Sequence, residues 1–208
     1  MPAPRLILAS GSPERRRLLV EAGYTFEVFP ARDEVECGIC STGGPATLVT
    51  ELAISKAMDV AAQLGARGAA TAESPCIVLA GDTVAECGGE VLGKPVDEDH
   101  ARNMLERLRD TVHRVYSGVC TWTSPATAGE PDVRLAISEL RMDAISDDEL
   151  DDYLASGLWQ GKAGAFGLQD RAGWLHLISG TESNVCGLPM ELVVEMLAAH
   201  GVAPSQTA

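Results

Sequence analysis

The sequence is poor in aromatic residues and in positive charge, and these shortages narrow what the protein can be. Only 4% of its 208 residues are aromatic, so Leu, Val, Ile and Ala have to fill the core. Sixteen basic residues stand against 30 acidic ones, which gives a formal net charge of −14. Because binding to nucleic acid or to a membrane surface requires a basic face, the composition argues against both as general functions. Any site for an anion must therefore be a local concentration of Lys and Arg.

Long apolar runs and paired cysteine motifs are missing too. No stretch approaches the roughly 18 to 20 apolar residues of a membrane-spanning helix, and the N-terminus lacks a long apolar segment with a small-residue cleavage site. We therefore expect a cytoplasmic protein. The six cysteines are too few and too scattered for a disulfide framework. Cys37 and Cys40 have the CxxC spacing, but no second CxxC or His pair completes a zinc site.

What the chain does have is a loose alternation of strand-like and helix-like segments. A chain of this length can form one domain or a compact two-lobed one. Strands are predicted at 5–9, 24–29, 112–123, 133–142 and 174–178, and another runs from Cys76 through Asp82 to a hairpin turn at Gly88-Gly89. Helices are predicted at 13–22, 46–64, 97–109, 146–155 and 190–199. Adjacent strands imply antiparallel pairs, so we predict a mixed-sheet α/β protein.

The first strand leads into the segment Ser10-Gly-Ser-Pro-Glu-Arg-Arg-Arg17. Pro13 suits the first turn of a helix, and Ser12 before it can accept hydrogen bonds from free backbone N–H groups. A strand, a small-residue turn and a helix N-terminus make a ready phosphate site, and arginine adds bidentate hydrogen bonds to phosphoryl oxygens. An ordinary strand-turn-helix with a solvated basic face explains these residues equally well.

A second segment places an acid and a base near one end of the sheet. Asp82 follows an apolar strand and a glycine, and Lys94 returns across the short hairpin. One interpretation is a surface salt bridge, which contributes little to stability. The other is a carboxylate that binds Mg²⁺ or activates water, beside a lysine that binds phosphate. The local pattern favours neither.

Three further features have a functional and a plain structural interpretation. In Lys162-Ala-Gly-Ala-Phe-Gly-Leu-Gln169, glycines permit close approach to a ligand and the Gln amide can pair with a base edge, although a flexible loop fits the segment alone. Lys56 lies on the apolar side of its helix, where a lysine is uncommon unless it snorkels or meets an anion. Glu34, in an acidic loop, is either a metal ligand or a solvated carboxylate.

Taken together, these segments resemble the Maf nucleoside triphosphate pyrophosphatases. The motifs are Ser-x-Ser-Pro-x-Arg-Arg, Asp-Glu, a helical Lys-Ala, Gly-Asp-Thr with Gly-Lys-Pro, Lys-Ala-Gly-Ala-Phe-Gly-Leu-Gln and the closing Ser183-Asn-Val-Cys-Gly-Leu-Pro189. They follow one another in the family's order over residues 5–197. The resemblance implies an elongated α/β fold related to the inosine triphosphate pyrophosphatases, with residues 1–208 forming one domain of two lobes around a deep cleft.

The resemblance also implies an activity and its site. The expected reaction hydrolyses a nucleoside triphosphate (dTTP, UTP or another pyrimidine nucleotide) to the monophosphate and pyrophosphate with Mg²⁺ or Mn²⁺. Asp82 and Lys94 would be catalytic, with Asp82 either the general base or, with Glu34, a metal ligand. The substrate-binding positions fall on Ser10, Ser12, Arg15, Lys56 and Lys162. The nucleotide is the expected partner, without nucleic acid or membrane, and a homodimer is a further expectation.

Three positions linked to base choice in the family fall on Glu14, Thr83 and Gln169. Thr83 and Gln169 match the branch that acts on dTTP and UTP, whereas Glu14 departs from it, because that branch carries Arg. The departure removes a positive charge from the phosphate-binding turn, which Arg16 or Arg17 could partly replace. The alternative function is a nucleotide-binding regulator of cell division with little catalysis, in keeping with the family's other name, septum-formation inhibitor.

Overall fold

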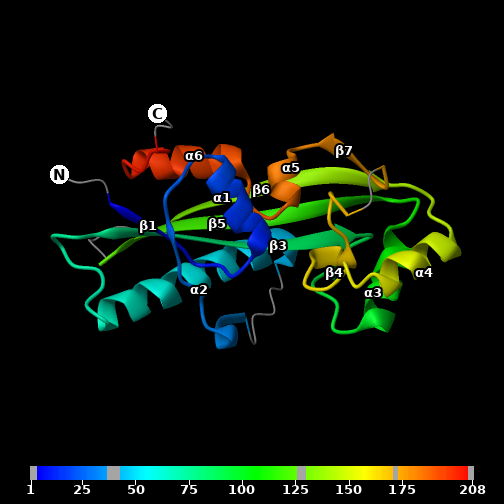
Figure 1. Ribbon diagram of the computed structural model, residues 1–208, viewed down its shortest axis with the longest axis horizontal. Helices are drawn as coiled ribbons and strands as arrows, with labels where there is room; N and C mark the ends of the chain where they lie inside the picture. The colour runs from blue at the N-terminus through cyan, green and yellow to red at the C-terminus, as the bar shows by residue number, and fades with distance from the viewer. Residues whose placement is uncertain (1–3, 37–42, 126–129, 171–172, 206–208) are drawn as a thin grey trace.

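The fold is built on one mixed sheet (Figure 1). A computed structural model describes residues 4–36, 43–125, 130–170 and 173–205 of the chain. The strand order is β2-β1-β3-β5-β6-β7, with β4 paired to β3. The strands are β1 (Arg5–Leu8), β2 (Glu27–Val28), β3 (Cys76–Cys87), β4 (Glu90–Leu92), β5 (Val112–Ser124), β6 (Asp132–Met142) and β7 (Leu175–Ser179). β1 runs parallel to β2 and β3 while the other pairs are antiparallel, so the predicted mixed-sheet α/β class is confirmed.

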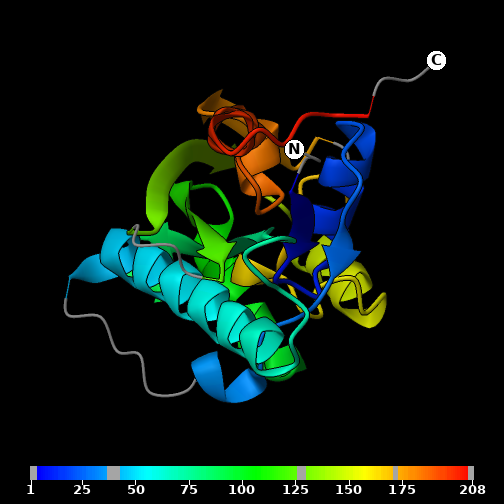
Figure 2. The same ribbon diagram turned by 90° about the vertical axis from the view of Figure 1, so that its left-hand side faces the viewer.

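Helices cover both faces of this sheet. The described residues form α1 (Pro13–Glu21), α2 (Gly44–Ala66), α3 (Glu98–Leu108), α4 (Asp147–Ala155), α5 (Glu182–Val185) and α6 (Met190–Ala199), with short 3₁₀ turns η1 (Asp33–Glu36) and η2 (Ala163–Ala165). Figure 1 shows α1 and α6 above the sheet, α2 below it, and α3 and α4 at the far end. Seen along the long axis, α2 and α6 lie on opposite sides of the strands (Figure 2). Within the described ranges, no helix is long and apolar enough to cross a membrane.

The side chains of β3 alternate between the two covered faces, as the period of two in a strand requires. Val78 packs in the cluster that contains the apolar residues of α2, whereas Leu79 packs in the cluster formed with α1 and α6. Continued along the strand, this alternation puts Asp82 on the α2 side and Thr83 on the α1 side. Two neighbouring residues therefore face different helices.

Part of the β3 edge has no partner strand. The parallel pairing with β1 ends where Leu8 lies opposite Leu79, and the antiparallel pairing with β4 begins only at Ala85. Between these points, β3 has no strand on that side within the described part of the chain. The opening lies where Asp82 and Thr83 project.

Most predicted elements are confirmed to within two residues, and the main exception has a local cause. The strand predicted at 24–29 spans only Glu27–Val28. Gly23 has a φ of 78°, and Tyr24 donates its N–H to the Leu19 carbonyl at 3.0 Å, so these residues complete the C-terminus of α1 instead. α5, η1 and η2 were not predicted because they are too short to show a period. The CxxC pair lies outside the described residues.

Gly118 sets how closely α2 approaches the sheet. A Cβ atom at this position would lie 2.3 Å from the Val49 carbonyl oxygen and 2.7 Å from the Thr50 nitrogen. We predict that Gly118→Ala lowers the free energy of unfolding by about 1–3 kcal/mol, because α2 has to move away from β5. Chemical denaturation measures the change. Gly65→Ala, inside α2 and facing open space, is the control and should raise stability by up to about 1 kcal/mol. A Gly118→Ala protein as stable as the wild type would contradict this account.

Candidate active site

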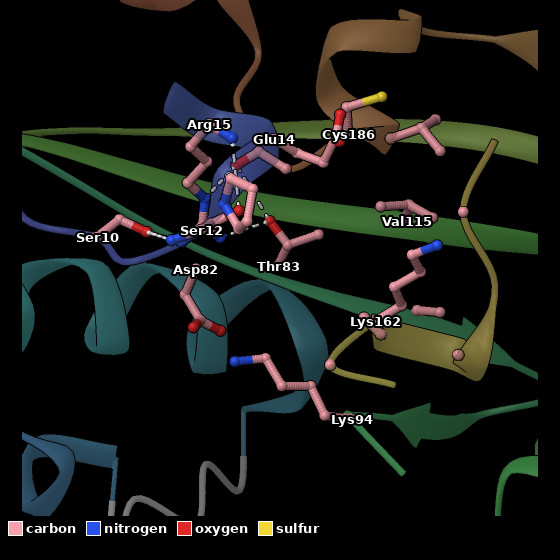
Figure 3. Close-up of a pocket in the computed structure, with 18 of the residues that line it drawn as sticks. Ser10, Ser12, Glu14, Arg15, Asp82, Thr83, Lys94, Val115, Lys162 and Cys186 are labelled. Carbon is pink, nitrogen blue, oxygen red and sulfur yellow. Dashed lines mark hydrogen bonds between the residues drawn. The ribbon is translucent and has the colours of Figure 1, made fainter. Parts of the chain in front are cut away.

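A cavity of about 500 Å³ opens at the unpaired edge of β3 (Figure 3). Its walls come from β3 and β5, from the segments that follow β1, β2 and β4, and from two loops at 161–169 and 185–187. The structure brings ten of the predicted site residues together here: Ser10, Ser12, Glu14, Arg15, Lys56, Asp82, Thr83, Lys94, Lys162 and Gln169. Glu34 is the predicted residue that it leaves out of the lining.

Arg15 joins three distant segments at the rim of this cavity. Its Nε donates to the Gly187 carbonyl at 2.7 Å, and its terminal nitrogens donate to the hydroxyls of Ser10 and Thr83, each at 3.2 Å. Ser12 caps α1, because its Oγ accepts from the Arg15 backbone N–H at 3.4 Å. The turn between β1 and α1 is thus fixed with the helix N-terminus at the cavity, which favours an anion there.

Asp82 is paired with Lys56 and not with Lys94. The Lys56 ammonium donates to Asp82 Oδ1 at 2.7 Å, and the two side chains are 8% and 14% exposed. Of the two possibilities for Lys56, snorkelling or an anion, the structure shows the anion, whereas a surface salt bridge between Asp82 and Lys94 is wrong. Figure 3 shows Lys94 and Asp82 pointing toward one another. Lys94 has neither an ion pair nor a hydrogen bond within the ranges that the structure describes.

Lys162 reaches the cavity from a loop that Asp170 holds in place. The ammonium donates to both carboxylate oxygens of Asp170, whose side chain is only 5% exposed. The same carboxylate accepts from Tyr153 Oη and from the Gly167 backbone N–H, each at 2.8 Å. The segment is therefore a braced loop and not a flexible one. Asp170 was missed because its residue type and its position after Gln169 carry no signal of this contact.

The cavity concentrates positive charge within an acidic protein. Its lining contains five cations, Arg15, Arg32, Lys56, Lys94 and Lys162, and three carboxylates, Glu14, Asp33 and Asp82. The sequence expectation that Arg16 or Arg17 would supplement the charge is wrong, because neither lines the cavity. Arg17 lies on the outer face of α1, where it bonds to Glu14 at 3.0 Å and to Glu21 at 2.7 Å.

Arg32, which the sequence analysis missed, is held beside the cavity by a carboxylate of α2. Its backbone N–H and its guanidinium both donate to Asp59, whose side chain is 4% exposed. These bonds attach the segment after β2 to α2 and bring Asp33 to the lining. Glu34, the next residue on η1, is exposed. The structure thus brings Asp33, and not Glu34, to the cavity together with Asp82.

The other half of the cavity is largely apolar. Its walls include Leu108, Val115, Leu140, Met142, Phe166, Leu168 and Leu175. The Phe166 ring stacks on Trp174, with centroids 5.4 Å apart, so aromatic packing supports this wall. Gln169 lines the cavity near Cys186, whose thiol contacts the Gln169 amide oxygen at 3.9 Å. A charged half and an apolar half suit a ligand that carries an anionic chain on an apolar, planar group.

The chain resembles known proteins over nearly its whole length. The family model described as Maf-like protein matches residues 5–200. A protein of Rhodopirellula baltica named dTTP/UTP pyrophosphatase is 47% identical over 193 residues, which are 92% of this chain and 80% of that protein. Proteins of the same name from Chelativorans sp. and Moorella thermoacetica are 39% and 37% identical. They match 97% and 95% of this chain, and 94% and 96% of their own lengths.

His113, a buried residue of β5 that also lines the cavity, makes stability depend on pH. Burial lowers its pKa to about 4, while the Glu86 carboxylate acts in the opposite direction. The unfolded chain, with a His pKa of about 6.5, binds more protons between these values, so stability falls as pH decreases through this window. We predict a loss of about 2 kcal/mol from His113 between pH 7.5 and pH 5.

Chemical denaturation at the two pH values measures this loss. His113→Phe keeps a ring of similar size and should remove that share of the pH dependence. His176→Gln, at an exposed position of β7, should retain it. Equal pH dependence of the free energy of unfolding in wild type and His113→Phe would show that His113 has the same pKa in the folded and the unfolded chain.

Proposed function

The chain belongs to the Maf-like protein family, and from this membership and the geometry of the cavity we propose that it is a nucleoside triphosphate pyrophosphatase. The proposed substrates are pyrimidine nucleotides, as the names of its relatives indicate for those proteins. One observation carries the proposal, namely that five cations line the same cavity as Asp82 at the unpaired edge of β3. A triphosphate with about four negative charges needs such a concentration, because phosphoryl transfer is catalysed chiefly by positioning and charge neutralisation.

In this proposal the charged half of the cavity binds the triphosphate and the apolar half binds the base. The triphosphate binds at the turn of Ser10 and Ser12, with Arg15 at the helix N-terminus and with the lysines around Asp82. The base enters the apolar half, where Thr83 and Gln169 supply polar groups. A volume of about 500 Å³ lies within the range of small-molecule sites.

The donor set at the phosphate end suits a magnesium or manganese ion that arrives with the substrate. The described residues contain no group of three metal-ligating side chains. Mg²⁺ is commonly held by one or two carboxylates together with substrate phosphates and water. Asp82 and Asp33 line the cavity and would supply those carboxylates, with Glu34 beside Asp33 on the same turn. When bound, the ion would neutralise charge on the phosphates.

The proposed reaction is attack of water on the α-phosphorus. The bond to the bridging oxygen of the β-phosphate breaks, and the products are the monophosphate and pyrophosphate. Asp82 can accept the proton that the water loses, because its carboxylate lies between Lys56 and the open cavity. Lys94, which points toward Asp82, would stabilise charge that develops on the phosphates.

Several wider properties are part of the same proposal. We propose one domain for residues 1–208, because β3, β5 and β6 run through the whole length of the sheet (Figure 1). We also propose a cytoplasmic enzyme that binds no nucleic acid, in keeping with a net charge of −14. A homodimer remains a prediction.

Asp82→Asn tests the catalytic role directly. The amide keeps the size of the side chain and an oxygen for Lys56 but cannot accept the proton. We expect kcat for pyrophosphate release from UTP with Mg²⁺ or Mn²⁺ to fall about 10²- to 10⁴-fold. UTP should still raise the melting temperature, because the cations that bind the phosphates remain. Asp99→Asn, which removes an exposed acid from the first turn of α3, is the matched control.

Two outcomes would contradict this assignment. Wild-type turnover by Asp82→Asn would remove Asp82 from the chemistry. A wild-type protein that UTP stabilises thermally, but that releases no pyrophosphate from any common triphosphate, would instead be a nucleotide-binding regulator.

Glu14 should weaken the binding of the triphosphate. It lines the cavity at the start of α1, where its charge repels an anion bound at the same turn. Glu14→Gln should lower the Michaelis constant for UTP about two- to fivefold at low ionic strength, and less at high ionic strength. Glu21→Gln is a close control, because Glu21 bonds to the same Arg17 but does not line the cavity. Equal Michaelis constants in Glu14→Gln and wild type would place the Glu14 charge out of reach of the substrate.

A further inference from the structure

His113 lies at the apolar end of the cavity with its hydrogen-bonding capacity unused. The residue is 5% exposed and lines the cavity beside Val115 and Leu140. Within the described ranges its ring makes no hydrogen bond; Nδ1 is buried out of reach, so Nε2 is the ring nitrogen that a ligand in the cavity can meet. An unpaired polar group in such a place costs about 1–3 kcal/mol. An apolar side chain of the same size would stabilise the core more. The presence of a histidine here is therefore better explained by a hydrogen bond to a bound ligand than by packing.

The ring faces this cavity without charge at neutral pH. Burial lowers the pKa of His113 to about 4, and a neutral imidazole has one donor and one acceptor. Arg15 and the Lys56–Asp82 pair lie at the other end of the cavity, whereas the Lys162 ammonium lies near Val115 and is neutralised by Asp170 (Figure 3). A neutral ring among aliphatic walls suits a partner that is itself uncharged, apolar on its faces and polar at its edge.

The polar residues implied in base choice are already engaged, in contrast to His113. Thr83 Oγ1 accepts from Arg15 at 3.2 Å and shares a hydrogen bond with Ser117 at 2.8 Å. The Gln169 amide oxygen contacts the Cys186 thiol. Thr83 and Gln169 shape the cavity and can contribute to selection of the base, but part of their hydrogen-bonding capacity is already used within the protein.

We propose that His113 contacts the edge of the nucleobase and takes part in base selection, an inference that rests on the proposed function. Once the triphosphate is bound at the cationic end, the base lies at the apolar end where His113 is. Uracil and thymine present carbonyl oxygens and a ring N–H at one edge, and an imidazole with one donor and one acceptor can pair with such groups. The base would meet Nε2, which makes no hydrogen bond in the described structure, so the complex gains a bond that the free protein lacks.

Two variants and two ligands test this contact. His113→Phe keeps the ring but removes both nitrogens, and His113→Gln restores a donor and an acceptor. We expect His113→Phe to lower kcat/KM for UTP about 5- to 100-fold, with partial recovery in His113→Gln. Inhibition by inorganic tripolyphosphate, which has no base, should stay unchanged in both variants. His176→Phe, at an exposed position of β7, is the control.

The wild-type protein provides a second test that needs neither turnover nor a folded variant. The sequence has four histidines, so ¹⁵N spectra of the imidazole rings are simple, and His113 is identified by its titration near pH 4. Adding UMP should shift the ring nitrogens of His113, and adding pyrophosphate alone should leave them in place. This measurement stays informative even if the protein hydrolyses no nucleotide, so failure of the proposed function and failure of this inference are distinguishable.

Unchanged kcat/KM for UTP in a folded His113→Phe protein would make His113 a ring of the core. Weaker inhibition by tripolyphosphate, to the same degree as the loss with UTP, would mean that the substitution disturbs the whole cavity. His113 nitrogens that shift with pyrophosphate and not further with UMP would place the base elsewhere.

Discussion

The site depends on a difference in length between two adjacent strands. β1 ends opposite Leu79 while β3 continues to Cys87, and β4 covers only the last part of the exposed edge. Because side chains alternate along a strand, Asp82 and Thr83, which lie on this unpaired part of β3, project toward opposite faces of the sheet. Asp82 meets α2 through Lys56, and Thr83 meets α1 through Arg15. The cavity therefore surrounds a strand edge, and helices from both faces contribute to it.

The cations of the cavity are placed by carboxylates that are largely buried. Asp82, Asp59 and Asp170 have side chains that are 14%, 4% and 5% exposed, and each holds a different cation at the lining. Such pairs add little net stability, but removing one partner leaves a buried charge uncompensated and is costly. Their effect here is to fix charged groups in position before an anion arrives, which reduces the reorganisation that catalysis requires. Lys94 differs, because it has no such partner among the described residues.

The sequence predicted most of the fold and most of the charged residues that line the cavity. The turn after β1, the hairpin at Gly88-Gly89 and the apolar position of Lys56 each follow from a short pattern and its period. The pairing of Asp82 with Lys56 could not be predicted in the same way. Lys56 is 26 residues from Asp82 in the sequence, whereas Lys94 is closer to Asp82. The three-dimensional arrangement of the strands and α2, and not spacing along the chain, determines which lysine pairs with Asp82.

The residues that sequence reasoning missed share one property, which is that their role depends on burial. In the sequence Arg32 and Asp170 look like ordinary loop residues. In the structure Arg32 is bonded to the buried carboxylate of Asp59, and Asp170 is bonded to Lys162. His113 is one residue in a long strand, and only the register of β5 turns it toward the cavity. Asp33 and Glu34 are adjacent acids, and the attachment of Arg32 to α2 determines which of them reaches the lining.

The acid at position 14 is compatible with an anion site because its charge is balanced outside the cavity. Arg17 bonds to Glu14 at 3.0 Å on the outer side of α1, where water and salt screen both charges over about 8 Å. Arg15 lies on the inner side of the same helix, and the lower dielectric of the cavity strengthens its attraction for an anion. The field inside the cavity is therefore dominated by the inner residues. Glu14 also lies near Cys186, whose thiol contacts Gln169, so this acid is close both to the turn after β1 and to a residue proposed to meet the base.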